Sequence, residues 1–223
     1  VMVQYYFGYY SVFSGQTMYE KWIYQIYNVT FTGLPIIWYA LYDFEFERAE
    51  LLGNPIHFRI GINDMCYSFP QFMRWVLYAF AHAFMVLYLS FVFPCSSEMD
   101  DGQTFGFWAG GHHVYMNCIL LSNFVVFRMQ NLFTGYGEVI TLAQIGSYFG
   151  ILYYFNNELR TDVIYLFWDE FMGSASAWLG CFFIVSSLWT LDKMLEVLWI
   201  WVFSGRDVSA EPPKLTDEER QTH

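Results

Sequence analysis

Residues 13–35 read FSGQTMYEKWIYQIYNVTFTGLP. A short polar loop leads directly into an apolar stretch that a simple membrane anchor would fill with leucine. Amides, hydroxyls and helix breakers occupy the second half of this stretch instead: Gln25, Asn28, Thr30, Thr32, Gly33 and Pro35. Proline removes a backbone donor from a helix and glycine weakens the helix beside it, so we predict a kink at Gly33–Pro35.

The spacing of the polar residues predicts that they share a face. Gln25, Asn28, Thr32 and Pro35 recur at positions that lie on one side of a regular α-helix. Polar groups at membrane depth face a bundle interior or a hydrated path. They also form hydrogen bonds between neighbouring helices. The residues alone leave both interpretations open.

The composition indicates a membrane protein. Of 223 residues, 56% are hydrophobic, 23% are aromatic and 14% are charged, whereas soluble domains are about 25% charged. Tyrosine and tryptophan concentrate where membrane proteins meet the interfaces. Long, continuously apolar runs favour helices over barrel strands. We predict an all-α, polytopic transmembrane helix bundle.

The predicted spans follow from length, because a helix needs about 20 residues to cross the hydrocarbon core. Residues 1–13 are too short to cross and are interpreted as the end of a partial N-terminal span. Residues 192–203 are predicted as an interfacial helix, with Asp192, Lys193 and Glu196 on its polar face. Residues 204–223 are predicted as a polar cytosolic tail or linker after a membrane domain of residues 1–203. The five full spans are predicted at 22–42, 72–94, 112–133, 138–156 and 171–191.

Basic residues set the predicted orientation. Eight of the 10 lysines and arginines lie in or beside the loops 43–71 and 134–137 and the tail after 191. Lys21 and Arg160 are the two near the loops 14–21, 95–111 and 157–170. Basic residues favour the cytosolic side, so we expect an integral membrane protein with a cytosolic C-terminus.

Several function classes are disfavoured. A net charge of −11 argues against nucleic-acid binding. His82 and the pair His112–His113 fall at different predicted depths, which suits packing better than paired haem ligation. No nucleophile–base pair, phosphate-binding glycine loop or metal motif is visible. We therefore expect no catalytic, cofactor-binding or metal-binding residue in this chain.

The opening stretch resembles the loop and sixth transmembrane helix of type IV P-type ATPases, the ATP-driven phospholipid flippases. That family carries FSGQ, then YNVxFTSLP, then a Phe-Asp pair at the cytosolic helix end. Gly33 replaces the serine, and Tyr42-Asp43 stands for the Phe-Asp pair. The following PIHFRIGIND, residues 55–64, also fits a family loop pattern. The resemblance places residues 1 to about 205 from the end of span five to span ten. The matching residues are Phe13–Gln16, Tyr27–Val29, Phe31–Thr32 and Leu34–Pro35.

The resemblance implies a role in moving a phospholipid headgroup. Dehydrating a headgroup is costly, so a path for it needs weak, exchangeable polar partners. The resemblance also implies docking of a glycosylated two-span accessory subunit on loops 95–111 and 157–170. Gln16 would contact lipid at the outer loop, and Gly33 and Pro35 would make the helix irregular. The predicted path residues are Gln16, Gln25, Asn28, Thr32, Gly33 and Pro35.

The phosphorylation motif DKTGT, the dephosphorylation motif and the nucleotide-binding domain of the family are absent from this sequence. We expect ATP and Mg²⁺ to bind in a catalytic region supplied in cis or in trans. Two alternatives stay open: a non-catalytic, flippase-derived structural subunit of a larger membrane assembly, or the flippase-like part of a fusion protein continuing after residues 204–223 into a domain such as a nucleotide cyclase. A haem-bearing respiratory subunit is a more distant alternative.

Overall fold

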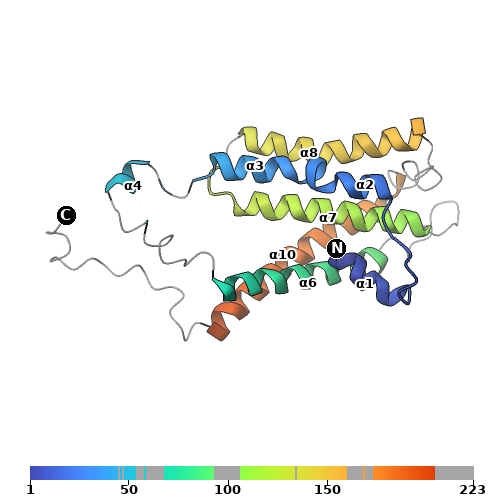
Figure 1. Ribbon diagram of the computed structural model, residues 1–223, viewed down its shortest axis with the longest axis horizontal. Coiled ribbons are helices and arrows are strands. Elements are labelled where there is room, and N and C mark those ends of the chain that lie inside the picture. The colour runs from blue at the N-terminus through green and yellow to red at the C-terminus, as the bar shows by residue number, and fades with distance from the viewer. Residues whose placement is uncertain are drawn as a thin grey trace. The chain divides into compact units, whose positions relative to one another are not determined.

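The protein is described by a computed structural model in which all regular secondary structure of the described residues is helical (Figure 1). This agrees with the predicted all-α class. The described residues are 1–44, 46, 48–53, 58, 68–92, 106–133, 135–159, 168 and 173–203. The elements are α1 (Met2–Tyr10), α2 (Lys21–Ile26), the π-helix η1 (Tyr27–Phe31), α3 (Gly33–Tyr42), α4 (Arg48–Gly53), α6 (Phe69–Val92), α7 (Phe107–Met129), α8 (Gly135–Tyr154), the π-helix η3 (Phe155–Leu159) and α10 (Ala175–Phe203).

Among the described residues, α6 is the one helix both long and apolar enough to be a candidate membrane span. The segment 22–42 is divided into shorter helices, and α7 carries histidines and amides that lower its hydropathy. The count of five full spans therefore stays a prediction. So does the cytosolic position of the C-terminus.

α10 differs from the predicted division at residue 191. It is one continuous helix from Ala175 to Phe203, through most of the predicted span 171–191 and all of the predicted interfacial helix 192–203. Its continuity keeps Asp192 in register with Leu188 one turn earlier, and both side chains are buried. The predicted polar face is therefore wrong at Asp192, whereas Lys193 and Glu196 are exposed and form an ion pair with an N–O distance of 3.0 Å.

The chain divides into two compact units. One comprises Val1–Glu45 and Trp75–Leu188, and the other Phe46–Arg74 and Trp189–His223. In the second unit, the Arg74 guanidinium carbon lies 5.8 Å from the centre of the Trp199 ring. At this distance the positive charge of Arg74 is attracted to the face of the Trp199 ring, a cation–π contact.

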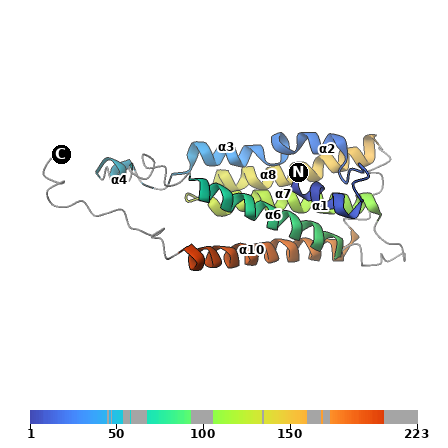
Figure 2. The same cartoon turned by 60° about the horizontal axis from the view of Figure 1, so that its bottom comes forward.

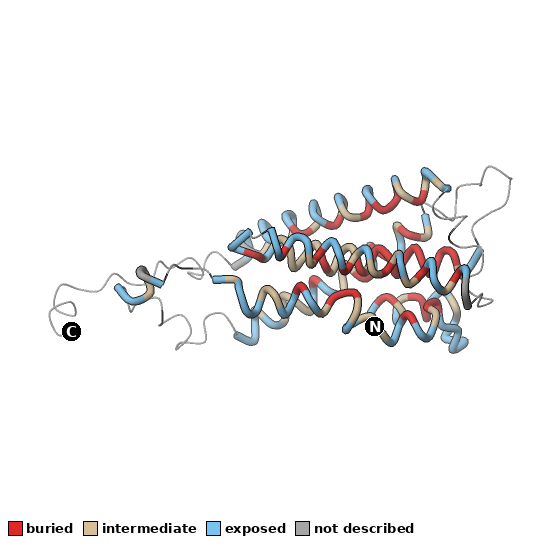
Figure 3. Tube along the Cα trace, turned by 90° about the horizontal axis from the view of Figure 1, so that it is seen from above, coloured by how far each residue is buried: buried red, intermediate tan, exposed pale blue. Residues whose placement is uncertain are grey.

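In the first unit, α3 and η1 pack beside α8, and α7 packs against α3 and α8 (Figures 1 and 2). α7 is the central helix, since every residue from Ala109 to Asn117 is buried (Figure 3). Phe31, Tyr115 and Tyr148 form an aromatic cluster with ring centroids 5.4 to 6.3 Å apart. Through Phe31, the cluster packs the segment α2–η1–α3, which we call the second helical segment, against α7 and α8.

Candidate functional site

The segment predicted as one span, 22–42, is a helix broken in the middle. α2 ends at Ile26, the π-helix η1 follows, and α3 begins at Gly33. Thr32 joins them with φ −139° and ψ −13°, outside helical geometry. Pro35 lies in the first turn of α3, where its missing N–H disturbs the helix least. The predicted kink is present, and the structure adds the π-helical turn before it.

Gly33 is required by this break. A Cβ atom at residue 33 would lie 2.7 Å from the carbonyl oxygen of Asn28, closer than real Cβ contacts. The π-helical turn brings that carbonyl toward residue 33. Any larger side chain at this position would have to shift the backbone of one segment or the other.

The break leaves three carbonyl groups without their usual helical donors. The N–H of Tyr27 bonds to Tyr24 rather than to Ile23. The regular donor for Phe31 would be residue 35, which is a proline without an N–H. Thr30 lies one residue before the end of the π-helical turn at Phe31, close to the joint at Thr32.

Side chains from α7 and α8 bond to these carbonyls. The hydroxyl of Tyr115 donates to Ile23 O at 2.7 Å. The amide of Asn123 donates to Phe31 O at 2.9 Å, and that of Gln144 donates to Thr30 O at 2.8 Å. The backbone around the break is thus held by polar side chains of neighbouring helices, and irregular backbone inside a membrane would need such partners.

Sequence reasoning missed these three donors. The available signal was the presence of Asn123 and Gln144 inside predicted spans, where amides are uncommon. Their partners could not be assigned because the carbonyls concerned are freed only by the break in the second helix.

The break also changes which side each predicted path residue faces. Gln25 and Asn28 are exposed, whereas Thr32 and Pro35 are buried. The Thr32 hydroxyl donates to Tyr27 O at 3.3 Å, within its own segment. The predicted shared face is therefore wrong, because a π-helical turn adds a residue and rotates the following helix by about 100°.

Gln25 and Asn28 line a cavity of about 270 Å³, which we call the tyrosine cavity. Its other lining residues carry no acidic or basic side chain. They are Val1, Val3, Tyr19, Tyr24, Tyr27, Tyr115 and Cys118. The cavity thus offers amide and phenol groups, which form hydrogen bonds without a fixed charge.

A second cavity of about 410 Å³ reaches Gln16 and is called the loop cavity. It shares Val1 and Tyr24 with the tyrosine cavity. Three of the six predicted path residues, Gln16, Gln25 and Asn28, therefore line two adjoining cavities. Thr32, Gly33 and Pro35 line neither, and instead shape the break.

The loop that carries Gln16 is fixed at both ends. Gln4 of α1 donates to Gln16 O at 3.0 Å and accepts from the Met18 N–H at 3.3 Å. The Met18 carbonyl packs so closely on Gly111 of α7 that a Cβ there would overlap it. Burial raises the pKa of Tyr19, the next residue, well above its usual value, so its phenol stays neutral.

The other end of the second helical segment is also fastened. The Asp43 carboxylate accepts from the backbone N–H groups of Asn131 and Leu132 at 3.0 and 2.8 Å. These residues lie between the end of α7 at Met129 and the start of α8 at Gly135. The Tyr42-Asp43 pair singled out by the resemblance thus anchors the end of α3 to the α7–α8 connection.

The three histidines of the described residues, His82, His112 and His113, line neither cavity. His112 and His113 are buried in α7, and His113 Nε2 lies 3.3 Å from Cys181 Sγ of α10. His82 belongs to α6. Within the described ranges, no group of three or more His, Cys, Asp or Glu residues is placed to hold a metal ion. The loops 95–111 and 157–170, predicted to dock an accessory subunit, lie largely outside the described residues.

Comparisons with known proteins agree with the resemblance. A model of the C-terminal region of phospholipid-translocating P-type ATPases matches residues 1–204. The phospholipid-transporting ATPase dnf1 of Schizosaccharomyces pombe is 23% identical over 191 residues, covering 83% of this chain and 12% of that protein. The probable phospholipid-transporting ATPase 12 of Arabidopsis thaliana is 21% identical over 187 residues, covering 80% and 15%. The phospholipid-transporting ATPase IH of Homo sapiens is 23% identical over 229 aligned positions, covering 98% and 20%.

This chain spans between 12 and 20% of the length of these three relatives. The family match covers the broken helix, both cavities and the helices that hold them. The chain belongs to the family of C-terminal regions of phospholipid-translocating P-type ATPases.

Proposed function

We propose that this chain forms part of the lipid translocation path of an ATP-driven phospholipid flippase, with Gln25 and Asn28 facing the moving headgroup. The observation that carries the proposal is that both amides are exposed and line a cavity that has no acidic or basic side chain and adjoins the loop cavity. Relatives named as phospholipid-transporting ATPases support the substrate class.

The chemistry of the tyrosine cavity suits transient binding. A headgroup leaving water loses hydrogen bonds, at a cost of several kcal/mol per unpaired polar group. The amides of Gln25 and Asn28 and the phenol of Tyr24 offer donors and acceptors that replace part of the lost hydration. None of them forms a permanent ion pair that would trap the phosphate, so the headgroup can leave again.

The loop cavity extends this chemistry toward Gln16. Gln16 is exposed, and Gln4 and Met18 hold the backbone of its loop in place. A headgroup leaving the tyrosine cavity past Tyr24 would meet the Gln16 amide next. Gln16 therefore acts at the outer end of the path, in the predicted orientation.

The broken helix supplies the means to change shape. A π-helical turn can return to α-helical pairing by moving one residue, which alters the rotation of Asn28 relative to α3. The energy for that change comes from ATP hydrolysis in a catalytic region acting in cis or in trans, where ATP and Mg²⁺ bind. Thr32, Gly33 and Pro35 act in this interpretation by shaping the break, not by touching lipid.

The proposal is tested by substituting the amides in the full-length protein. Asn28→Leu and Gln25→Leu should each lower the transport of a fluorescent phospholipid at least fivefold per mole of protein, with abundance unchanged. Val29→Leu, at an exposed neighbour outside the cavity lining, is the matched control and should transport normally. Normal transport in both amide variants would remove Gln25 and Asn28 from the translocation path and overturn the proposal.

A further inference from the structure

We propose that the tyrosine cavity selects a phospholipid with a choline headgroup, a proposal that rests on the proposed function and names the substrate class for the same path. The quaternary ammonium of choline lies against the tyrosine rings, and its phosphate accepts hydrogen bonds from the side-chain amides of Gln25 and Asn28. Among the described residues, the lining of this cavity of about 270 Å³ holds four tyrosines, two amides and no acidic or basic side chain.

The tyrosine rings lie close together in two orientations. Tyr19 and Tyr24 are nearly parallel, with an interplanar angle of 9° and ring centroids 6.0 Å apart. Tyr115 stands at 62° to Tyr19, with centroids 5.2 Å apart. Tyr27 stands at 70° to Tyr115, with centroids 5.6 Å apart. Rings in different orientations surround a cation with several electron-rich faces, which is how aromatic cages bind quaternary ammonium groups.

Hydrogen bonds to the protein occupy the hydroxyl groups of two of these rings. Tyr115 donates to Ile23 O at 2.7 Å. Ser122 Oγ donates to Cys118 O at 2.8 Å, so the Tyr27 hydroxyl is the donor in its own 2.7 Å bond to Ser122. Tyr27 and Tyr115 therefore offer a ligand mainly their ring surfaces, which suits a group that forms no hydrogen bonds.

The cavity distinguishes choline from other headgroups by what its lining lacks. The trimethylammonium of choline has no N–H group, so it leaves no donor unpaired when it loses water. The primary ammonium of ethanolamine is compact and strongly hydrated, and it brings three N–H donors. A serine headgroup adds a carboxylate. Among the described residues, the lining offers no acidic side chain to the ammonium and no basic side chain to the carboxylate, so desolvation is least costly for choline.

The amides lie beside the rings in a repeated pair. Tyr24 directly precedes Gln25, and Tyr27 directly precedes Asn28. Residues three apart are neighbours on a helix surface, so the two pairs lie next to each other along α2 and η1. Each amide NH₂ group has two donors for a phosphate oxygen. One short segment therefore serves both the phosphate and the ammonium of the headgroup.

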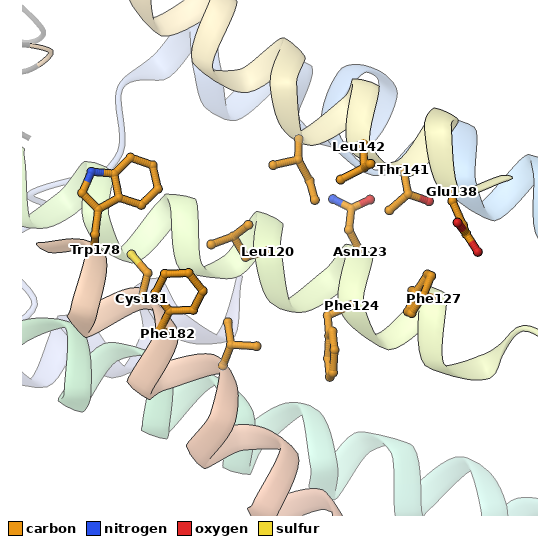
Figure 4. A pocket seen from close by; sticks show the side chains of 12 residues that line it. Leu120, Asn123, Phe124, Phe127, Glu138, Thr141, Leu142, Trp178, Cys181 and Phe182 are labelled. Carbon is orange, nitrogen blue, oxygen red and sulfur yellow. The ribbon is translucent and has the colours of Figure 1, made fainter. Parts of the chain in front are cut away.

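A larger pocket between α7, α8 and α10, which we call the lateral pocket, lacks this combination (Figure 4). It has a volume of about 490 Å³ and also contains aromatic rings, such as that of Phe182. The Nδ2 group of its amide, Asn123, already donates to Phe31 O and to Ile119 O, both at 2.9 Å. The carboxylate of Glu138 in its lining repels a phosphate. Of these two pockets, the tyrosine cavity is the one that combines rings with exposed amides.

The experiment measures transport by the full-length protein in liposomes, with fluorescent phospholipids that differ only in the headgroup. We expect transport to rise with each methyl group added to ethanolamine, and the choline lipid to be carried about tenfold faster than the ethanolamine lipid. A 3,3-dimethylbutyl headgroup has the shape of choline with carbon in place of nitrogen. It lacks the positive charge and should be carried about fivefold more slowly than choline.

Variants locate the preference, read as the ratio of choline-lipid to ethanolamine-lipid transport. Tyr24→Leu removes a ring and should lower the ratio about fivefold, whereas Tyr24→Phe keeps the ring and should keep the ratio. Trp22→Leu is the matched control, because it removes an exposed aromatic side chain of the same helix outside the cavity lining. Phe182→Leu removes a ring from the lateral pocket. Both should leave the ratio unchanged.

Equal transport of the choline, ethanolamine and dimethylbutyl lipids would overturn the proposal. So would faster transport of a serine lipid, an unchanged ratio in Tyr24→Leu, an equal loss in Tyr24→Phe, or a loss in Phe182→Leu alone. A failure of the translocation path gives a different result, because Gln25→Leu and Asn28→Leu would then leave the transport of every headgroup normal. Slow transport in both amide variants without any headgroup preference would overturn the choline selection and leave the path in place.

Discussion

Asn123→Leu should loosen the broken helix at one specific place, because Asn123 replaces the donor that Pro35 cannot supply. The Asn123 amide donates to Phe31 O at 2.9 Å, and both residues are buried. An unpaired buried carbonyl costs about 1–3 kcal/mol. Hydrogen bonds between helices in membranes average about 0.6 and reach about 1.7 kcal/mol. We therefore expect a loss of about 1–1.5 kcal/mol.

The assay is amide hydrogen exchange in the full-length protein, read at residues 27–36. A loss of about 1.4 kcal/mol raises the population of the locally open form about tenfold, and the exchange rate with it. Asn117→Leu removes another buried amide of α7, one that donates to Ser90 and to its own helix. It should leave exchange at residues 27–36 unchanged.

A second substitution makes the test specific. Pro35→Ala restores an N–H that can bond to Phe31 O, so Asn123→Leu should cost at least 0.5 kcal/mol less in that background. Additive effects of the two substitutions, or unchanged exchange in Asn123→Leu alone, would refute the assignment of Asn123 as the donor that compensates for proline.

Two further predictions concern the ends of the same segment. Asp43→Ala removes the acceptor for two backbone N–H groups of the α7–α8 connection and should lower the free energy of unfolding by about 1–2 kcal/mol, measured by thermal unfolding against a Glu138→Ala control. Burial raises the pKa of Tyr19 above its usual value of about 10, so the stability that its neutral form contributes is constant below pH 10 and falls as the pH rises toward the folded-state pKa. Tyr19→Phe should flatten this alkaline loss, and an identical alkaline profile in the variant would contradict the assignment to Tyr19.

The sequence predicts the location of the break better than its consequences. Gly33 and Pro35 mark a discontinuity in any helix, so the kink follows from local chemistry. The π-helical turn does not, because its free carbonyls are stable only with donors from distant segments such as Gln144. A prediction of helix faces from 3.6 residues per turn also fails across the π-helical turn, because the turn contains one more residue. For this reason Thr32 is buried although Asn28 is exposed.

In α10, local composition predicted neither the continuity of the helix nor the burial of Asp192. The charged residues after Leu191 suggest the start of a surface helix, yet α10 continues to Phe203 and keeps Asp192 buried. Local composition gives the average polarity of a segment. The partners that bury a particular side chain come from helices elsewhere in the chain, and one sequence does not specify them.

The most direct test of the proposed path is the water accessibility of the broken helix in the intact protein. Asn28→Cys and Thr32→Cys are compared for reaction with a charged, membrane-impermeant thiol reagent, with the parent protein as the background for its native cysteines. The tyrosine cavity predicts that the thiol at residue 28 reacts at least tenfold faster than the buried thiol at residue 32. No reaction at residue 28 would show that Asn28 faces a dry surface, and equal rates would show that residue 28 is no more accessible than residue 32. Either result would contradict the place of Asn28 on the headgroup path.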